Sequence, residues 1–215
     1  MGTLGMVKID LPDGDAVTAT VRGDGKTTLL LAHGAGTDQH HRSIVGIASS
    51  LAERGIRIVT FDYPYTQAGR RRPDRAPLLM SCHAAVAEAT AQRFGGPLVL
   101  GGRSMGGRMA TMLVSGGYPA RGVALYAYPL HPAGKPAKLR VDHLAKVEVP
   151  MVFFQGSRDA LSRADLFDLH VRPLPRASVV DMTGADHSFR GKDWPESRLY
   201  EFLADHTADW IETLD

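Results

Sequence analysis

The sequence predicts an α/β protein in which a mostly parallel central sheet carries helices on both faces. Two observations support this fold class. Short apolar, β-branched runs alternate along the chain with segments of helical periodicity, and several of these runs are apolar throughout, as expected of strands buried on both faces. In such sheets functional side chains gather at the carboxyl ends of the strands, so the search for a site starts there.

The first half of the chain is expected to begin with an antiparallel hairpin. Its strands lie at residues 7–11 and 16–21, separated by the turn residues Pro12-Asp13-Gly14. The next predicted elements are a strand at 28–32, a helix whose apolar face comprises Ile44, Ile47, Ala48 and Leu51, a strand at 56–61, a loop that includes 62–65 and 70–75, and a helix at 84–94 ended by Gly95-Gly96-Pro97.

The second half repeats the alternation of strands and helices. The predicted elements are a strand at 98–100, a helix at 105–114, strands at 123–126, 152–154 and 178–182, and a closing helix that starts near Pro195. In this last helix Leu199, Phe202, Leu203, His206 and Trp210 recur at helical spacing. We therefore expect Trp210 in the core and His206 in helix packing.

Composition bounds the class of protein. The chain has 215 residues, 44% of them hydrophobic, and a formal net charge of +2. These values fit one globular domain spanning residues 1–215 and exclude a chain that is disordered overall. No apolar run approaches the roughly 18 residues that cross a bilayer, and the first residues lack the pattern of a signal peptide. A lone cysteine, Cys82, forms no internal disulfide, so we expect a cytoplasmic protein with no membrane partner.

The densest group of charges is Arg70-Arg71-Arg72-Pro73-Asp74-Arg75. Neither interleaved aromatic residues nor a nucleic-acid-binding motif surrounds it, so we interpret it as a solvated loop and expect no nucleic-acid partner. The sequence leaves open whether this run or Arg103 contacts an anionic substrate, and it leaves the oligomeric state unknown.

The segment Gly102-Arg103-Ser104-Met105-Gly106 matches the pattern G-x-S-x-G. It follows an apolar strand and opens a helix, which predicts a sharp, strained turn with Ser104 as its nucleophile, a nucleophile elbow. Gly102 and Gly106 are needed because side chains at those positions would collide. The helix start brings the Met105 N–H close to a developing oxyanion. The alternative is a glycine-rich loop that only packs a helix on a strand.

A serine hydroxyl becomes a nucleophile only when a general base accepts its proton and an acid orients that base. Of the nine histidines, His187 follows the last predicted strand and is the expected base. Asp159 follows the strand at 152–154 and is the expected acid, or alternatively a cap for the next helix. Asp186 is a poorer candidate, since a sequence neighbour rarely folds back onto the histidine ring.

The turn His33-Gly34-Ala35-Gly36 follows the strand at 28–32. We expect the Ala35 N–H to be the second donor of an oxyanion hole and His33 to be a framework residue of this loop. The two glycine-rich motifs that bind nucleotide phosphates are absent from the sequence. His40 and His41 are adjacent and so point to different faces, which argues against a metal site there. We expect that the chemistry of the predicted site needs neither a metal nor an organic cofactor.

Residues 30–36, 101–108 and 155–159 together resemble the α/β-hydrolase superfamily, whose triad also follows the chain order Ser104, Asp159, His187. Residues 128–136 and 139–144 are similar to its dienelactone-hydrolase-like branch, which includes testis-expressed protein 30 and relatives of NSL-complex subunit 3. The resemblance spans 28–213 and implies that these three residues form a catalytic triad. It also implies that Ala35 and Met105 supply the oxyanion hole. Dienelactone hydrolases proper use a cysteine nucleophile, so their substrate is not carried over.

The segment 131–148 is too short to hold the lid that many α/β-hydrolases insert between two strands, so no lid domain is expected. An open, shallow site favours small-molecule acyl substrates. We expect a serine hydrolase that cleaves a small ester or thioester through an acyl-enzyme; the sequence does not separate esters, thioesters and lactones. The alternative is a non-catalytic interaction module with the same fold. Tyr63, Tyr65, Tyr128 and Phe189 are expected either in the pocket wall or in the core.

Overall fold

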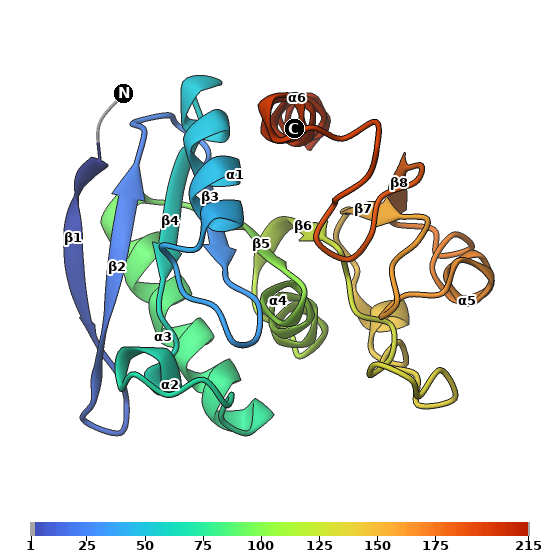
Figure 1. Cartoon of the computed structure of the whole chain (residues 1–215). Helices are drawn as coiled ribbons and strands as arrows, with labels where there is room; N and C mark the ends of the chain where they lie inside the picture. The colour runs from blue at the N-terminus through green and yellow to red at the C-terminus, as the bar shows by residue number, and fades with distance from the viewer. Residues whose placement is uncertain (1–2, 215) are drawn as a thin grey trace.

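The computed structural model describes residues 3–214, and its eight strands form one sheet in the order β1-β2-β4-β3-β5-β6-β7-β8 (Figure 1). The strands are β1 (Thr3–Asp10), β2 (Ala16–Arg22), β3 (Thr28–Ala32), β4 (Arg57–Phe61), β5 (Leu98–Arg103), β6 (Ala120–Tyr126), β7 (Met151–Gly156) and β8 (Ala177–Met182). From β4 to β8 neighbouring strands are parallel, whereas β2 pairs antiparallel with both β1 and β4. The predicted α/β class and N-terminal hairpin are confirmed.

Helices cover both faces of this sheet. They are α1 (Arg42–Glu53), α2 (Pro64–Gln67), α3 (Ala76–Phe94), α4 (Met105–Ser115), α5 (Ala164–His170) and α6 (Glu196–Glu212), with a 3-10 turn η1 (Leu144–Lys146). Helices α1 and α6 lie side by side over one face, and α3 and α4 cover the other (Figure 1). Along β3, Leu29 and Leu31 pack toward α1 and α6, while Leu30 packs toward α3 and α4. All three side chains are buried, as a strand in the middle of such a sheet requires.

Three features differ from the expectations. Helix α3 begins at Ala76 rather than at residue 84, because Pro77 falls in the first turn, where a proline costs no hydrogen bond. The short helices α2 and α5 were not predicted. On α6, His206 is exposed and its ring lies tilted against that of Phe202 on the same helix, so its predicted role in helix packing is wrong, and Thr207 takes the buried position. Trp210 is buried, as predicted.

The connection between β6 and β7 is long but largely irregular. Between β6 and β7, residues 127–150 contain no element other than η1, so in the described part of the chain no lid is inserted there. No helix within residues 3–214 has both the length and the apolar character needed to cross a membrane. Strands β3, β5, β7 and β8 all end at the carboxyl edge of the sheet, and the segments that directly follow them carry the predicted site residues.

Candidate active site

Ser104 occupies the single residue between β5 and α4. Its backbone has φ 52° and ψ −115°, a conformation that is strained for any residue other than glycine. The turn is tight because backbones meet on both sides of it. A Cβ atom at Gly102 would lie 2.4 Å from the Gly106 carbonyl carbon, and a Cβ atom at Gly106 would lie 2.4 Å from the Ala32 oxygen. Glycine at both positions therefore lets α4 start directly against β3 and β5 and point Ser104 away from the sheet.

The loops after β7 and β8 bring an acid and an imidazole to this serine. Asp159 Oδ2 lies 2.7 Å from His187 Nδ1, and His187 Nε2 lies 2.9 Å from Ser104 Oγ. A carboxylate beside Nδ1 selects the tautomer that carries its proton there, which leaves the Nε2 lone pair to accept from the serine hydroxyl. The Asp159 side chain is fully buried and that of His187 is 22% exposed. The contacts run without a break from the buried Asp159 carboxylate to the hydroxyl of Ser104, which is itself largely buried and lines a cavity.

The two candidate acids have separate partners. Besides His187, the Asp159 carboxylate accepts a 2.7 Å hydrogen bond from the Leu161 N–H, which holds it in place. It does not cap α5, whose N-cap is Arg163. The Asp186 carboxylate instead accepts from the N–H groups of Ser188 and Arg190 and so shapes its own loop.

The peptide between Gly34 and Ala35 is held in one orientation. The Gly34 carbonyl accepts from His33 Nδ1 at 2.8 Å and from the Thr37 hydroxyl at 2.9 Å. Because a trans peptide directs its N–H opposite to its C=O, these bonds turn the Ala35 N–H away from His33. Ala35 lines the same cavity as Ser104 and Met105. Met105 lies in the first turn of α4, where backbone N–H groups have no acceptor within the helix.

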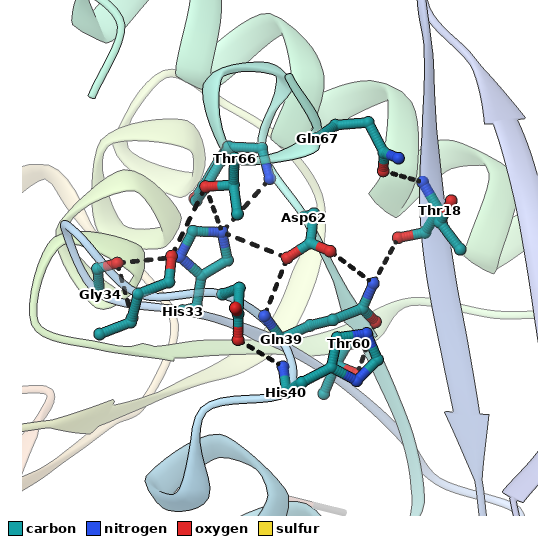
Figure 2. A network of polar contacts seen from close by, with 12 residues as sticks. Thr18, His33, Gly34, Gln39, His40, Thr60, Asp62, Thr66 and Gln67 are labelled. Atoms are coloured by element: carbon teal, nitrogen blue, oxygen red, sulfur yellow. Dashed lines mark hydrogen bonds and ion pairs between the residues drawn. The ribbon is translucent and has the colours of Figure 1, made fainter. Parts of the chain in front are cut away.

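Figure 2 shows the polar network around His33 and Asp62 that supports this turn. His33 is buried, and its Nε2 accepts from the Tyr63 N–H at 3.3 Å. Burial lowers the pKa of His33, which keeps the ring neutral so that Nδ1 donates and Nε2 accepts. The Asp62 carboxylate accepts from both the main chain and the side chain of Gln39, at 2.8 and 3.0 Å. His33 therefore supports the Gly34–Ala35 turn and takes no part in the contacts that join Asp159, His187 and Ser104.

Ser104 opens onto a cavity of about 290 Å³. Its lining combines apolar side chains, among them Met109 and Leu161, with the charged Asp74, Arg108 and Arg140. None of the four candidate aromatic residues lines it. Tyr63, Tyr65 and Tyr128 are buried in the core, whereas Phe189 lines a larger cavity of about 370 Å³ that Arg103 borders and Ser104 does not.

Three arginines lie near Ser104, and the sequence interpretation either left their roles open or missed them. Arg103 is only 8% exposed and donates from Nη2 to the His187 carbonyl. Arg108 could have been found, because it lies four residues after Ser104 on the same face of α4. Arg140 comes from the long β6–β7 connection, where no periodic signal exists. In the arginine-rich loop, Arg70 pairs with Asp74 and the remaining arginines are exposed.

Of the adjacent His40 and His41, the second has a structural role. The His41 ring accepts from the Ser43 N–H and caps α1. Within residues 3–214 no cluster of three or more histidine, cysteine, aspartate or glutamate side chains is arranged to hold a metal ion.

Comparisons with known proteins agree with this architecture. Residues 25–212 match the family described as alpha/beta hydrolase domain. A serine hydrolase without a lid from Xanthomonas campestris superposes with a TM-score of 0.77 at 21% identity, over 98% of this chain and 95% of that one. An esterase domain from a Rhodothermus marinus protein superposes with a TM-score of 0.74 at 15% identity, over 99% of each chain. A serine hydrolase homologue from Coxiella burnetii gives 0.76 at 19% identity, over 96% and 98%. The predicted fold is confirmed, and the chain belongs to the alpha/beta hydrolase family.

Proposed function

We propose that the protein is a serine hydrolase that cleaves a small ester or thioester through an acyl-enzyme intermediate. The observation that carries the proposal is the continuous set of contacts from Asp159 through His187 to Ser104, with separations of 2.7 and 2.9 Å. A serine with this partner is a competent nucleophile, whereas an isolated serine is not. The strained backbone at Ser104 supports the same role, because such strain is concentrated at functional sites.

Each residue then has one task. Ser104 Oγ attacks the acyl carbonyl carbon as His187 Nε2 takes its proton, and the Ala35 and Met105 N–H groups stabilise the oxyanion. As the tetrahedral intermediate collapses, His187 returns this proton to the leaving group and the acyl-enzyme remains. Water then attacks the acyl group with His187 again as the base, which frees the acid and restores Ser104. Asp159 holds the imidazole in the required tautomer throughout.

The site favours small substrates. A cavity of about 290 Å³ lies at the small end of ligand pockets, and the β6–β7 connection places no lid over it. The names of two structural neighbours, a serine hydrolase without a lid and an esterase domain, are in line with this proposal. The resemblance to the dienelactone-hydrolase-like branch adds to it but leaves the choice among ester, thioester and lactone open.

Turnover of p-nitrophenyl acetate tests the proposal. The protein should hydrolyse this ester, and Ser104→Ala should lower kcat by about 10³-fold or more. Circular dichroism of the variant shows that the loss is not one of folding. A well-folded protein that does not turn over activated esters would instead point to an interaction module, and undiminished turnover by Ser104→Ala would exclude this nucleophile.

A further inference from the structure

Two guanidinium groups line the cavity that holds the nucleophile. Arg108 closes the first turn of α4, and Arg140 comes from the β6–β7 connection. Neither forms an ion pair with an acidic side chain anywhere in residues 3–214. The Nε of Arg108 is buried and has no hydrogen-bond partner there. Buried or half-buried charges are normally paired, so two unpaired arginines at one cavity need a reason.

These two arginines are held close enough to repel each other. Burial lowers the pKa of Arg140, and the Arg108 charge lowers it further. The main chain of Arg140 is anchored at both ends, because its N–H donates to Leu130 at 2.8 Å and its carbonyl accepts from the Tyr128 hydroxyl at 2.9 Å. The fold thus maintains an unfavourable pair of like charges, and an anion placed between them would relieve the repulsion.

The other titratable groups leave this cavity positive. Burial and the Arg108 charge lower the pKa of the nearby His143 to about 4, so His143 is neutral at pH 7. Asp74 lines the cavity too, but both of its oxygens accept from Arg70, at 2.7 and 3.2 Å. Arg70 offsets the Asp74 charge, and Arg108 and Arg140 remain uncompensated.

The arginines lie on the acyl side of the scissile bond. The leaving group must sit beside His187 to receive its proton. The cavity that contains Arg108 and Arg140 is lined by Ser104, Ala35 and Met105 but not by His187. It therefore holds the acyl chain. Arg108 lies four positions after Ser104, which is about 6 Å along the helix axis and a span of a few methylene groups.

We infer that the preferred substrate is an ester or thioester whose short acyl chain ends in a carboxylate, bound by Arg108 and Arg140. The inference rests on the proposed hydrolase function and adds its substrate class. Guanidinium groups match the planar, two-oxygen geometry of a carboxylate. A carboxylate is also the smaller of the two oxyanions that guanidinium groups pair with, which suits a cavity of about 290 Å³ that also holds the acyl carbonyl.

Two matched substrates test the inference: the 4-nitrophenyl monoester of glutarate, and the same compound with its free carboxylate methylated. Rates are corrected for spontaneous hydrolysis with Ser104→Ala. The protein should favour the carboxylate by about tenfold or more in kcat/KM. This ratio should fall at least several-fold in Arg108→Met and in Arg140→Met. Arg176 is exposed and lies just before β8, at the amino ends of the parallel strands and so opposite the site. In the control variant Arg176→Met the ratio should stay unchanged. Because the ratio is taken within one variant, a general loss of activity cancels.

A second measurement needs no variant. Glutarate should inhibit turnover of p-nitrophenyl acetate competitively, whereas glutaramide, of similar size and neutral, should not. A ratio near one in the unmodified protein, or a ratio that both Met variants preserve, would overturn the inference while leaving the hydrolase intact. Inhibition by inorganic phosphate as strong as that by glutarate would overturn the choice of carboxylate. If the unmodified protein cleaves neither ester, the proposed function itself fails, and the inference fails with it.

Discussion

The guanidinium of Arg103 donates a 2.9 Å hydrogen bond from Nη2 to the main-chain carbonyl of His187, 84 residues along the chain. Arg103 directly precedes Ser104, so one side chain joins the β5–α4 turn to the loop that carries His187. Burial lowers the pKa of this guanidinium, and the nearby Asp159 carboxylate opposes that shift. The bond therefore stabilises the loop position at which His187 Nε2 lies 2.9 Å from Ser104 Oγ.

Arg103→Met should lower kcat for p-nitrophenyl acetate by about 10- to 100-fold, the range of a hydrogen bond to a charged group, with little change in KM. Arg103→Lys should recover part of the loss. Arg190→Met removes an exposed arginine of the same loop and serves as the control. A folded Arg103→Met variant with unaltered kcat would show that Arg103 does not position His187.

The two candidate acids should respond very differently to substitution. Asp159→Asn should lower kcat by a factor on the order of 10⁴, because an amide allows the wrong tautomer of His187, as in the serine-protease triad. Asp186→Asn should cost far less, since Asp186 bonds only to N–H groups of its own loop. Steady-state kinetics of both variants measure this contrast. The reverse order of effects would make Asp186 the acid.

Acid should destabilise the protein through a buried histidine. Burial lowers the pKa of His83 to about 3, whereas the unfolded chain has a value near 6.5. As pH falls below 6.5, the unfolded state binds a proton that the folded state refuses, so stability is lost between about pH 6.5 and 3. His83 alone should lower the free energy of unfolding by about 2 kcal/mol between pH 7 and 5.

Urea denaturation at pH 7 and pH 5 measures this loss. His83→Gln should show a smaller pH dependence than the unmodified protein by about that amount. The exposed His40, changed to Gln, is the matched control and should retain the original dependence. If all three proteins lose the same stability, His83 is not the group responsible.

If the proposed activity holds, kcat/KM should not benefit from long neutral acyl chains. Each methylene adds about 0.8 kcal/mol of binding only when it is buried, and the cavity at Ser104 is small and has no lid. A series of p-nitrophenyl esters from acetate to palmitate should therefore show no rise in kcat/KM beyond about four carbons. A steady increase through decanoate would reveal a long acyl channel.

Local patterns predicted the elbow, and long-range contacts determined what was missed. The strand before Ser104 and the helix after it have strong apolar signals, and the motif supplies the turn between them. The start of α3 was missed because Pro77 and the adjacent arginines resemble a loop. At the end of the chain, Thr207 replaces His206 in the core because its hydroxyl meets that of Tyr126 at 2.9 Å, a contact between residues 81 apart.

Long-range contacts also explain why the charged lining of the cavity was not fully predictable from the sequence. Arg108 follows from helical spacing, but Arg140 is brought to the site by the Tyr128 hydroxyl, which bonds to its carbonyl in an irregular connection. Hydrophobic periodicity cannot predict the position of a side chain in such an irregular segment. The dienelactone-hydrolase-like assignment and the cytoplasmic location stay predictions.

Labelling with a fluorophosphonate, followed by peptide mass mapping, tests the central claim that Ser104 is an activated nucleophile. The single cysteine does not interfere, because Cys82 is buried and burial raises its pKa to about 12. The account predicts one adduct per chain, on the peptide that contains Ser104, and none in folded Ser104→Ala. No adduct on the folded unmodified protein, or equal labelling of Ser104→Ala, would contradict it.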